Sequence, residues 1–320
     1  MSVASIPDAR AAVPHVAPHV HRTPLLCSRL LSEATGFEVR LKAELFQRTG
    51  SYKIRGPLYK LHLLSPEERR RGVVCSSAGN HAQGVALAAA MMGVRAVVVM
   101  AENATPSKVA ATKGYGGEVV LHGTIWDEAD QKARELVESE GLTYVHPFDD
   151  LDLIAGQGTL GLEIHQDWPE VELVVVPIGG GGLISGVSTA LKRSDPGIRV
   201  VGVESAGAPA MKLSVEQGRL VTLDQVDTVV DGLRVKRVGA ATFELVQRFV
   251  DEIVAVPDES IFRNVVWLME HAKLVAEGAA AATVAALREG LVKAPEGTRV
   301  ACVLSGGNLD LSQLEGLRWN

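Results

Sequence analysis

The sequence is poor in cysteine and aromatic residues, carries no excess of basic charge and contains no long apolar run. Its three cysteines are Cys27, Cys75 and Cys302, and their wide separation argues against a disulfide framework or a cysteine metal site. The formal net charge of -6 argues against a nucleic-acid partner. No run of 18 apolar residues exists and the N-terminus lacks an apolar signal segment, so the sequence predicts a cytoplasmic protein with no membrane partner.

Aliphatic residues, in contrast, are abundant and recur in strand-like runs. Hydrophobic residues make up 47% of the chain but aromatics only 4%, which is typical of buried parallel strands covered by helices. Between residues 67 and 149 the segments VVCS, AVVVM and EVVL each precede a helical stretch, and the pattern resumes with LVVVP, VVGVES, IVAV and RVACVLS. This alternation predicts an α/β protein with a small domain at 67–149, a large domain formed by 1–66 and 150–320, and a ligand cleft between them.

Four consecutive glycines at positions 179 to 182 follow the LVVVP segment and precede a helical stretch. Glycines allow close backbone approach, and the free amides of a helix N-terminus bind anions, so this segment predicts a phosphate site. A Walker A loop is excluded because no Gly-Lys-Ser/Thr follows, and the dinucleotide fingerprint fails because its last glycine would fall on Ile184 or Ser185. Glu204 ends the next strand, where a ribose-binding acid would lie, so a nicotinamide site stays open as an alternative.

Three further segments place polar residues beside glycines. They are RTGSYKIRG with Lys53, CSSAGNHAQG with Ser77 and Asn80, and LSGGNLD with Ser305. The second and third follow apolar strands, so their side chains should face the crevice at the strand ends. Taken singly, each has a structural explanation: a surface lysine, a helix N-cap and a turn.

Taken together, a lysine, an anion cradle and neutral hydrogen-bond partners match the needs of pyridoxal phosphate. Its aldehyde requires a lysine for a Schiff base, its phosphate an anion site, and its ring oxygen and nitrogen one partner each. The segments SYKIRG, SSAGNHAQG, GQGTLGLEI, PIGGGGLISG and LSGGNLDLS, in this order, resemble the serine/threonine dehydratase family of fold-type II pyridoxal phosphate enzymes. That family shares its architecture with the tryptophan synthase β chain, and the resemblance runs from residue 21 to the C-terminus.

The resemblance implies a role for each matched position. Lys53 would form the Schiff base and remove the α-proton, with Tyr52 packing beside the cofactor. Asn80 would hydrogen-bond the ring hydroxyl oxygen, and Ser305 the pyridine nitrogen. The cofactor phosphate would be held by Gly179, Gly180, Gly181, Gly182 and Leu183, and the substrate carboxylate by Ser77, Ala78, Gly79, Asn80 and His81. Glu277 would lie near the cofactor ring.

The sequence also departs from relatives within this family. Tyr52 stands where the family usually has phenylalanine. Ala78 occupies the position at which serine racemases carry a second acid/base serine, which favours elimination over racemisation. The divalent-metal site of racemase-like members pairs a glutamate with an aspartate six residues later, and here Glu204 is followed at that distance by Ala210, so no metal is expected.

The resemblance implies a dehydratase that converts L-threonine to 2-oxobutyrate and L-serine to pyruvate, releasing ammonia. Serine racemisation and dehydration of hydroxyaspartate or phenylserine remain alternatives within the same fold. A non-catalytic pyridoxal phosphate-binding protein and a nicotinamide oxidoreductase are alternatives from other classes. The substrate would be a small amino acid, and the family resemblance implies a homodimer or homotetramer.

Overall fold

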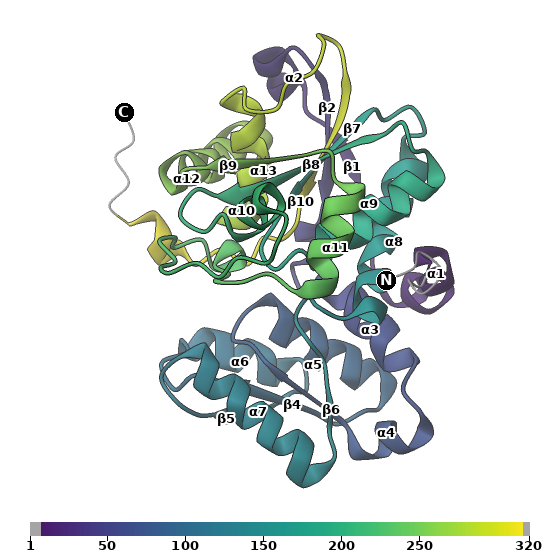
Figure 1. Cartoon of the computed structure of the whole chain (residues 1–320), viewed down its shortest axis with the longest axis vertical. Helices are drawn as coiled ribbons and strands as arrows, with labels where there is room; N and C mark the ends of the chain where they lie inside the picture. Colours follow the sequence, from purple (N-terminus) through teal and green to yellow (C-terminus); the bar gives the residue numbers. More distant parts are fainter. Residues whose placement is uncertain (1–7, 316–320) are drawn as a thin grey trace.

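The chain folds into two α/β units that lie one above the other, as shown by a computed structural model that describes residues 8–315 (Figure 1). The lower unit contains a four-stranded sheet in the order β5-β4-β3-β6, and all of its strand pairs are parallel. Its strands are β3 (Val73–Ser76), β4 (Ala96–Met100), β5 (Glu118–Leu121) and β6 (Thr143–Tyr144). Its helices are α4 (Pro66–Arg71), α5 (Asn80–Met92), α6 (Pro106–Gly114) and α7 (Trp126–Glu140).

The upper unit contains a six-stranded sheet in the order β1-β2-β10-β7-β8-β9. Its strands are β1 (Leu25–Cys27), β2 (Glu38–Ala43), β7 (Leu173–Pro177), β8 (Arg199–Ser205), β9 (Glu252–Val256) and β10 (Arg299–Leu304). The predicted parallel pairing holds for all of them except β1, which runs antiparallel to β2. An edge strand of three residues has only one ladder to satisfy, so an antiparallel β1 leaves the parallel core of the sheet intact.

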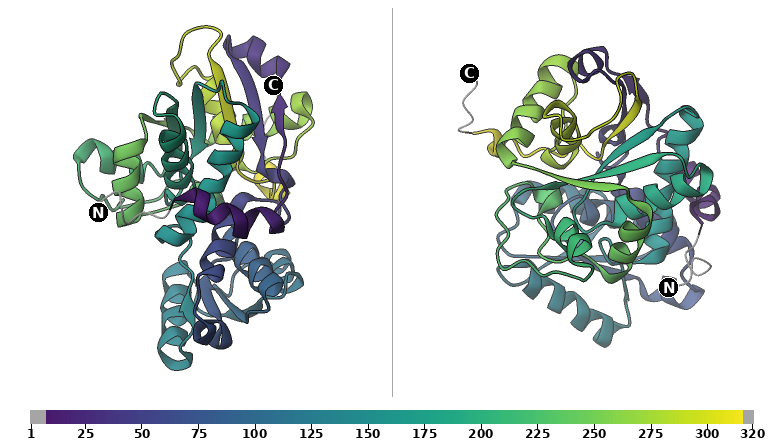
Figure 2. Two further views of the ribbon diagram at one scale, coloured as in Figure 1. Left: turned by 90° about the vertical axis from the view of Figure 1, so that its right-hand side faces the viewer. Right: turned by 45° about the horizontal axis from the view of Figure 1, so that its top comes forward.

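Helices cover both faces of the large sheet, as the two further views show (Figure 2). One face carries α8 (Leu151–Asp167), α9 (Gly182–Ser194), α10 (Ala210–Gln217) and α11 (Ala240–Phe249), and the other carries α2 (Arg29–Thr35), α12 (Asp258–Trp267) and α13 (Gly278–Arg288). Successive residues of β7 alternate between these two layers: Val175 packs with α13, whereas Val174 and Val176 pack with α8 and α9. The alanine-rich α13 is buried along nearly its whole length, as its composition predicts for a core helix.

Two helices, α1 (Ala9–Val16) and α3 (Arg55–His62), pack against both units. Leu58 and Leu61 of α3 pack in the same apolar cluster as Val73 and Val98 of the small sheet. Helix α3 also packs against α8, which belongs to the large unit. Because α3 contributes to both cores, the domain division at residue 66 stays a prediction.

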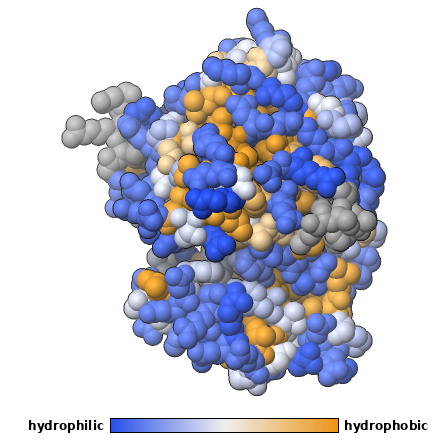
Figure 3. Space-filling model, in the orientation of Figure 1, coloured by the Kyte–Doolittle hydropathy of each residue, from blue (hydrophilic) through white to orange (hydrophobic). Residues whose placement is uncertain are grey.

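The outer surface is mostly hydrophilic on the face drawn in Figure 3, with apolar residues gathered mainly over the upper unit. Among residues 8–315, no helix has the length and apolar character needed to cross a membrane. The carboxyl ends of β3, β7 and β10 lead into the Asn80, glycine and Ser305 segments respectively. These three strand ends supply most of the candidate site.

Candidate active site

Lys53 lies in a short 3₁₀ turn, Tyr52–Ile54, immediately before α3. The turn is held against the end of β10, because the Tyr52 amide donates to the Ser305 carbonyl at 3.1 Å and Ser51 forms a β-bridge with Gly306. Lys53 Nζ donates to the Pro147 carbonyl at 2.9 Å. Burial lowers the pKa of Lys53 to about 8, although the Glu277 carboxylate favours its charged form. At pH 7 roughly a tenth of such amines are neutral, which suits a proton acceptor.

Helix α5 approaches the Lys53 backbone closely because residue 84 is glycine. A Cβ atom at Gly84 would lie 2.7 Å from the Lys53 carbonyl oxygen, closer than atoms can pack. The side chain of Tyr52 packs on the other side of the turn, within the cluster that contains α8 and α9. The lysine turn is therefore fixed between elements of both units.

The glycine segment, residues 179–182, forms the turn between β7 and α9. Gly181 has φ of 93° and caps α9, a conformation that other residues rarely adopt. Within the described part of the chain no side chain caps α9, and its first turn contains no acidic residue, so the first amides of the helix are available to an anion. The segment thus has the geometry of a helix N-terminal anion site, and its role as the phosphate cradle stays a prediction.

The residues Pro147 and Phe148, which follow β6, connect this cradle to Lys53. The Pro147 carbonyl accepts the hydrogen bond from Lys53, and the Phe148 ring packs directly on Gly180. Sequence reasoning gave these residues no role. A proline and an aromatic residue after a strand carry no local signal of contact with a glycine loop about 30 residues further on.

Replacing Gly180 with alanine is expected to damage this cradle. The new Cβ atom would lie 2.2 Å from the Phe148 ring, so the loop or the ring must move. Overpacking of this kind costs about 1–3 kcal/mol, and we expect a lower unfolding free energy together with weaker pyridoxal phosphate binding. Urea unfolding and cofactor titration measure the two effects. Gly114→Ala is the matched control, since no atom lies within 4 Å of its Cβ position, and equal behaviour of the two variants would contradict the prediction.

Ser305 follows β10 and is 2% exposed. Its hydroxyl has no hydrogen-bond partner in the described part of the chain. A buried hydroxyl without a partner is unfavourable unless a ligand satisfies it. The pyridine nitrogen of pyridoxal phosphate is an acceptor that such a hydroxyl can serve, and the lysine and anion cradle fit the other two functions of this cofactor.

Asn80 is the first residue of α5 and is hydrogen-bonded on both sides of its amide. Its Nδ2 donates to the two carboxylate oxygens of Glu277 at 3.0 and 2.9 Å, and its Oδ1 accepts from Asn308 Nδ2 at 2.7 Å. Glu277 precedes α13, and its backbone amide donates to the Gly306 carbonyl. The structure thus brings Lys53, Asn80, Glu277 and the Ser305 segment into one cluster.

The segment from Ser77 to His81 forms the N-terminal end of α5. Ser77 Oγ accepts a hydrogen bond from the Gly79 amide, which leaves its own O–H free to donate. No side chain caps this helix and its first turn contains no acidic residue, so Ala78 and its neighbours border an end suited to a carboxylate. His81 Nε2 contacts the Val145 carbonyl at 2.9 Å, and burial lowers its pKa to about 3. His81 is therefore neutral at physiological pH and orders the segment.

Glu204, which kept a nicotinamide site open, lies at the end of β8, and its carboxylate is bonded by the helix that follows. Its carboxylate accepts hydrogen bonds from the amides of Met211 and Lys212 in α10, both at 2.8 Å. Glu204 thus stabilises the start of α10.

Leu183 is buried in the first turn of α9 and packs in the core cluster that covers β7.

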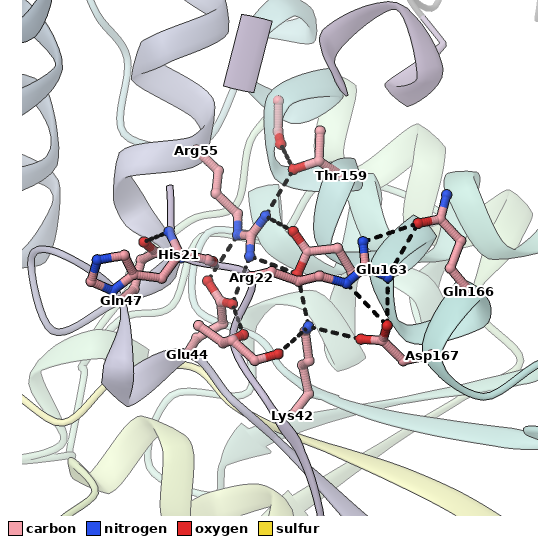
Figure 4. Close-up of polar contacts among 12 residues, drawn as sticks. His21, Arg22, Lys42, Glu44, Gln47, Arg55, Thr159, Glu163, Gln166 and Asp167 are labelled. Atoms are coloured by element: carbon pink, nitrogen blue, oxygen red, sulfur yellow. Dashed lines mark hydrogen bonds and ion pairs between the residues drawn. The ribbon is translucent and has the colours of Figure 1, made fainter. Parts of the chain in front are cut away.

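A buried network of charged side chains lies next to the lysine turn (Figure 4). Arg55 donates through Nε and Nη2 to both oxygens of Glu44, and through Nη1 and Nη2 to both oxygens of Glu163, over 2.7 to 3.0 Å. Lys42 Nζ donates to Glu163 at 2.7 Å and to the Thr23 carbonyl at 2.8 Å. Sequence reasoning missed this network, although Arg55 stands two residues after Lys53 in the SYKIRG segment.

Comparison with known proteins gives consistent matches along the chain. A model of the family described as "Pyridoxal-phosphate dependent enzyme" matches residues 16–306. An L-threonine ammonia-lyase of Thermotoga maritima is 52% identical, over 92% of this chain and 73% of its own. The catabolic L-threonine dehydratase of Escherichia coli K12 is 44% identical, over 97% of this chain and 94% of its own. Among solved structures, maize serine racemase superposes with a TM-score of 0.92 at 35% identity, over 96% of this chain and 94% of its own.

Proposed function

Because the chain belongs to the pyridoxal-phosphate dependent enzymes, we propose that it is a lyase that dehydrates L-threonine to 2-oxobutyrate and L-serine to pyruvate, with release of ammonia. The observation that carries the proposal is the Ser305 hydroxyl, which is buried beside the lysine turn and has no hydrogen-bond partner among residues 8–315. A neutral hydroxyl does not hold a proton on a pyridine nitrogen as an aspartate would. This arrangement favours elimination of the β-hydroxyl over transamination.

When bound, the cofactor supplies an electron sink that makes the α-proton of an amino acid acidic. The protein supplies the base: Lys53, whose pKa is lowered to about 8, accepts that proton at Nζ. The substrate carboxylate is oriented by the Ser77 hydroxyl and by the free amides at the start of α5. Each favourable charge contact with a helix terminus contributes up to about 1 kcal/mol.

The residue at position 78, an alanine, favours dehydration over racemisation. A racemase needs a second acid/base group on the face of the substrate opposite the lysine, and the methyl group of Ala78 offers none. The similarity to maize serine racemase is therefore a similarity of fold. Ala78 argues against a shared racemase reaction. The homodimer or homotetramer, the cytoplasmic location and the individual site roles stay predictions.

The purified protein supplied with pyridoxal phosphate is expected to release 2-oxobutyrate from L-threonine and pyruvate from L-serine. A coupled assay for 2-oxo acids measures both, and chiral chromatography of D-serine measures racemisation in the same samples. D-serine formed faster than pyruvate would favour the racemase. Cofactor binding without any turnover, also on hydroxyaspartate and phenylserine, would favour the non-catalytic alternative.

A further inference from the structure

The hydrogen bonds around Asn80 define which way its amide points. Its Nδ2 faces the Glu277 carboxylate, which can only accept when ionised, and its Oδ1 faces the Nδ2 of Asn308. Asn308 is itself oriented, because the same Nδ2 also donates to the Thr49 carbonyl at 2.8 Å. A backbone carbonyl cannot donate, so neither asparagine amide can be flipped without losing hydrogen bonds. Thr49, Asn308, Asn80 and Glu277 therefore form one connected set of hydrogen bonds in which the orientation of each asparagine amide is fixed.

Glu277 is held in place independently of Asn80. Its amide donates to the Gly306 carbonyl at 3.1 Å, directly after Ser305. A Cβ atom at residue 306 would lie 2.7 Å from Glu277 Oε1, so a larger residue there would displace the carboxylate from its present position. These hydrogen bonds thus link the start of α5, in the small unit, to the start of α13 and the Ser305 segment, in the large unit.

The carboxylate also lies among charged groups of both units. Burial raises the pKa of Glu277 to about 7, with Asp231 adding to the effect and with Asn80, Lys53 and Lys108 opposing it. Glu277 is therefore a carboxylate that the fold keeps partly buried even though burial disfavours its charged form. Such an arrangement is costly for stability alone, which suggests a functional reason for it.

We propose that Glu277 and Asn308 are positioning residues that present an N–H of Asn80 to the ring oxygen of the cofactor. The two Glu277 oxygens lie at nearly equal distances from Nδ2, so one shared N–H satisfies both and the second remains for a ligand. The inference rests on the proposed cofactor site, in which Asn80 serves the ring hydroxyl. In this arrangement neither Glu277 nor Asn308 needs to touch the cofactor.

The alternative is that the chain of side chains only fastens the two units together. Removing either Glu277 or Asn308 would then weaken the binding of every ligand of this site equally, whatever substituents its ring carries. Under our proposal, only ligands that carry the ring hydroxyl should be affected. The two explanations therefore differ in whether the loss of binding in a variant depends on the ring hydroxyl of the ligand.

The test measures equilibrium binding, without turnover, of two noncovalent probes. One is 4′-deoxypyridoxine 5′-phosphate, which keeps the ring hydroxyl, and the other is the same compound without that hydroxyl. Glu277→Ala and Asn308→Ala should each weaken binding of the first probe about tenfold, the usual effect of losing one hydrogen bond, and leave binding of the second unchanged. Glu277→Gln keeps one acceptor oxygen and should lose only about threefold.

The control is Glu270→Ala, an exposed glutamate in the helical segment before Glu277, which should leave both dissociation constants unchanged. Equal losses on both probes in Glu277→Ala and Asn308→Ala would overturn the proposal. So would a wild-type protein that binds the two probes equally well, because Asn80 would then not serve the hydroxyl. If Glu277→Ala does not fold, Asn308→Ala gives the same comparison with the carboxylate intact. Threonine turnover by the wild-type protein tests the proposed function separately from either result.

Discussion

Replacing Lys53 with alanine is expected to lower the rate of 2-oxobutyrate release from L-threonine by about 10²–10⁴-fold, the range that a positioned general base contributes. The loss should fall on kcat, because the amine acts on the α-proton rather than on the substrate carboxylate. The structure supports this role through the lowered pKa of Lys53 and its place in the turn held against Ser305. Steady-state rates with L-threonine over a range of concentrations separate kcat from KM.

The matched control is Lys113→Ala, which removes an exposed lysine of α6 and should leave the rate unchanged. Borohydride treatment of the wild-type protein, followed by peptide mass analysis, should place the cofactor on the peptide that contains Lys53. Attachment at another lysine, or a Lys53→Ala variant that retains more than about a tenth of the wild-type rate, would remove Lys53 from the role of base.

The sequence predicts the elements of the site better than the contacts between them. Strand periodicity and the following glycines locate the ends of β3, β7 and β10 to within a residue or two, because these signals are local. Parallel strands bring such ends to one edge of a sheet, which is why the glycine segment after β7 and Ser305 after β10 could be expected together. Asn80 follows a strand of the other sheet, so only the family resemblance placed it in the same site. The α/β class follows from the same alternation and is confirmed.

Contacts over long sequence separations were not predictable in this way. Glu277 meets Asn80 across 197 positions, and Glu163 meets Arg55 across 108. Neither pair belongs to a periodic pattern, and a carboxylate in a helical stretch reads as a solvated residue. The contact between the Phe148 ring and Gly180 was unpredictable for the same reason, because the sequence around neither residue indicates it. The antiparallel β1 is too short to carry a strand signal of its own.

Breaking the buried charge network should have the largest effect on stability. Replacing Arg55 with methionine keeps much of its volume but leaves Glu44, whose side chain is 0% exposed, without its main partner. Removing one member of a buried ion pair typically costs about 3–5 kcal/mol, because the remaining charge has neither water nor a counterion. We expect the midpoint of urea unfolding to fall accordingly, with an unchanged slope.

Two further variants distinguish the loss of a buried ion pair from the loss of a charge at any position. Arg29→Met removes an exposed pair with Glu33 and should change the unfolding free energy by less than about 0.5 kcal/mol. Adding Glu44→Gln to Arg55→Met should recover part of the loss, because Glu163 keeps Lys42 as its partner and no unpaired buried carboxylate then remains. A double variant, Arg55→Met with Glu44→Gln, that is less stable than Arg55→Met alone would contradict this explanation, and so would an Arg55→Met variant as stable as Arg29→Met.

The pH dependence of the Arg55→Met variant follows from the state of Glu44. In the native protein burial raises the pKa of Glu44, but Arg55, Thr23 and Lys42 outweigh it and leave the pKa below its ordinary value. This pairing therefore stabilises the fold above the unfolded pKa of about 4.5, and the stabilisation is lost as pH falls through the lower native value. Without Arg55 the unpaired carboxylate is relieved by protonation instead. The difference in unfolding free energy between the two proteins should thus be largest near neutral pH. It should shrink as pH falls, first through the raised pKa of the unpaired Glu44 in the variant and then, below about pH 4.5, through the lowered pKa of Glu44 in the native protein. A constant difference would place the cost of Arg55→Met in packing rather than charge.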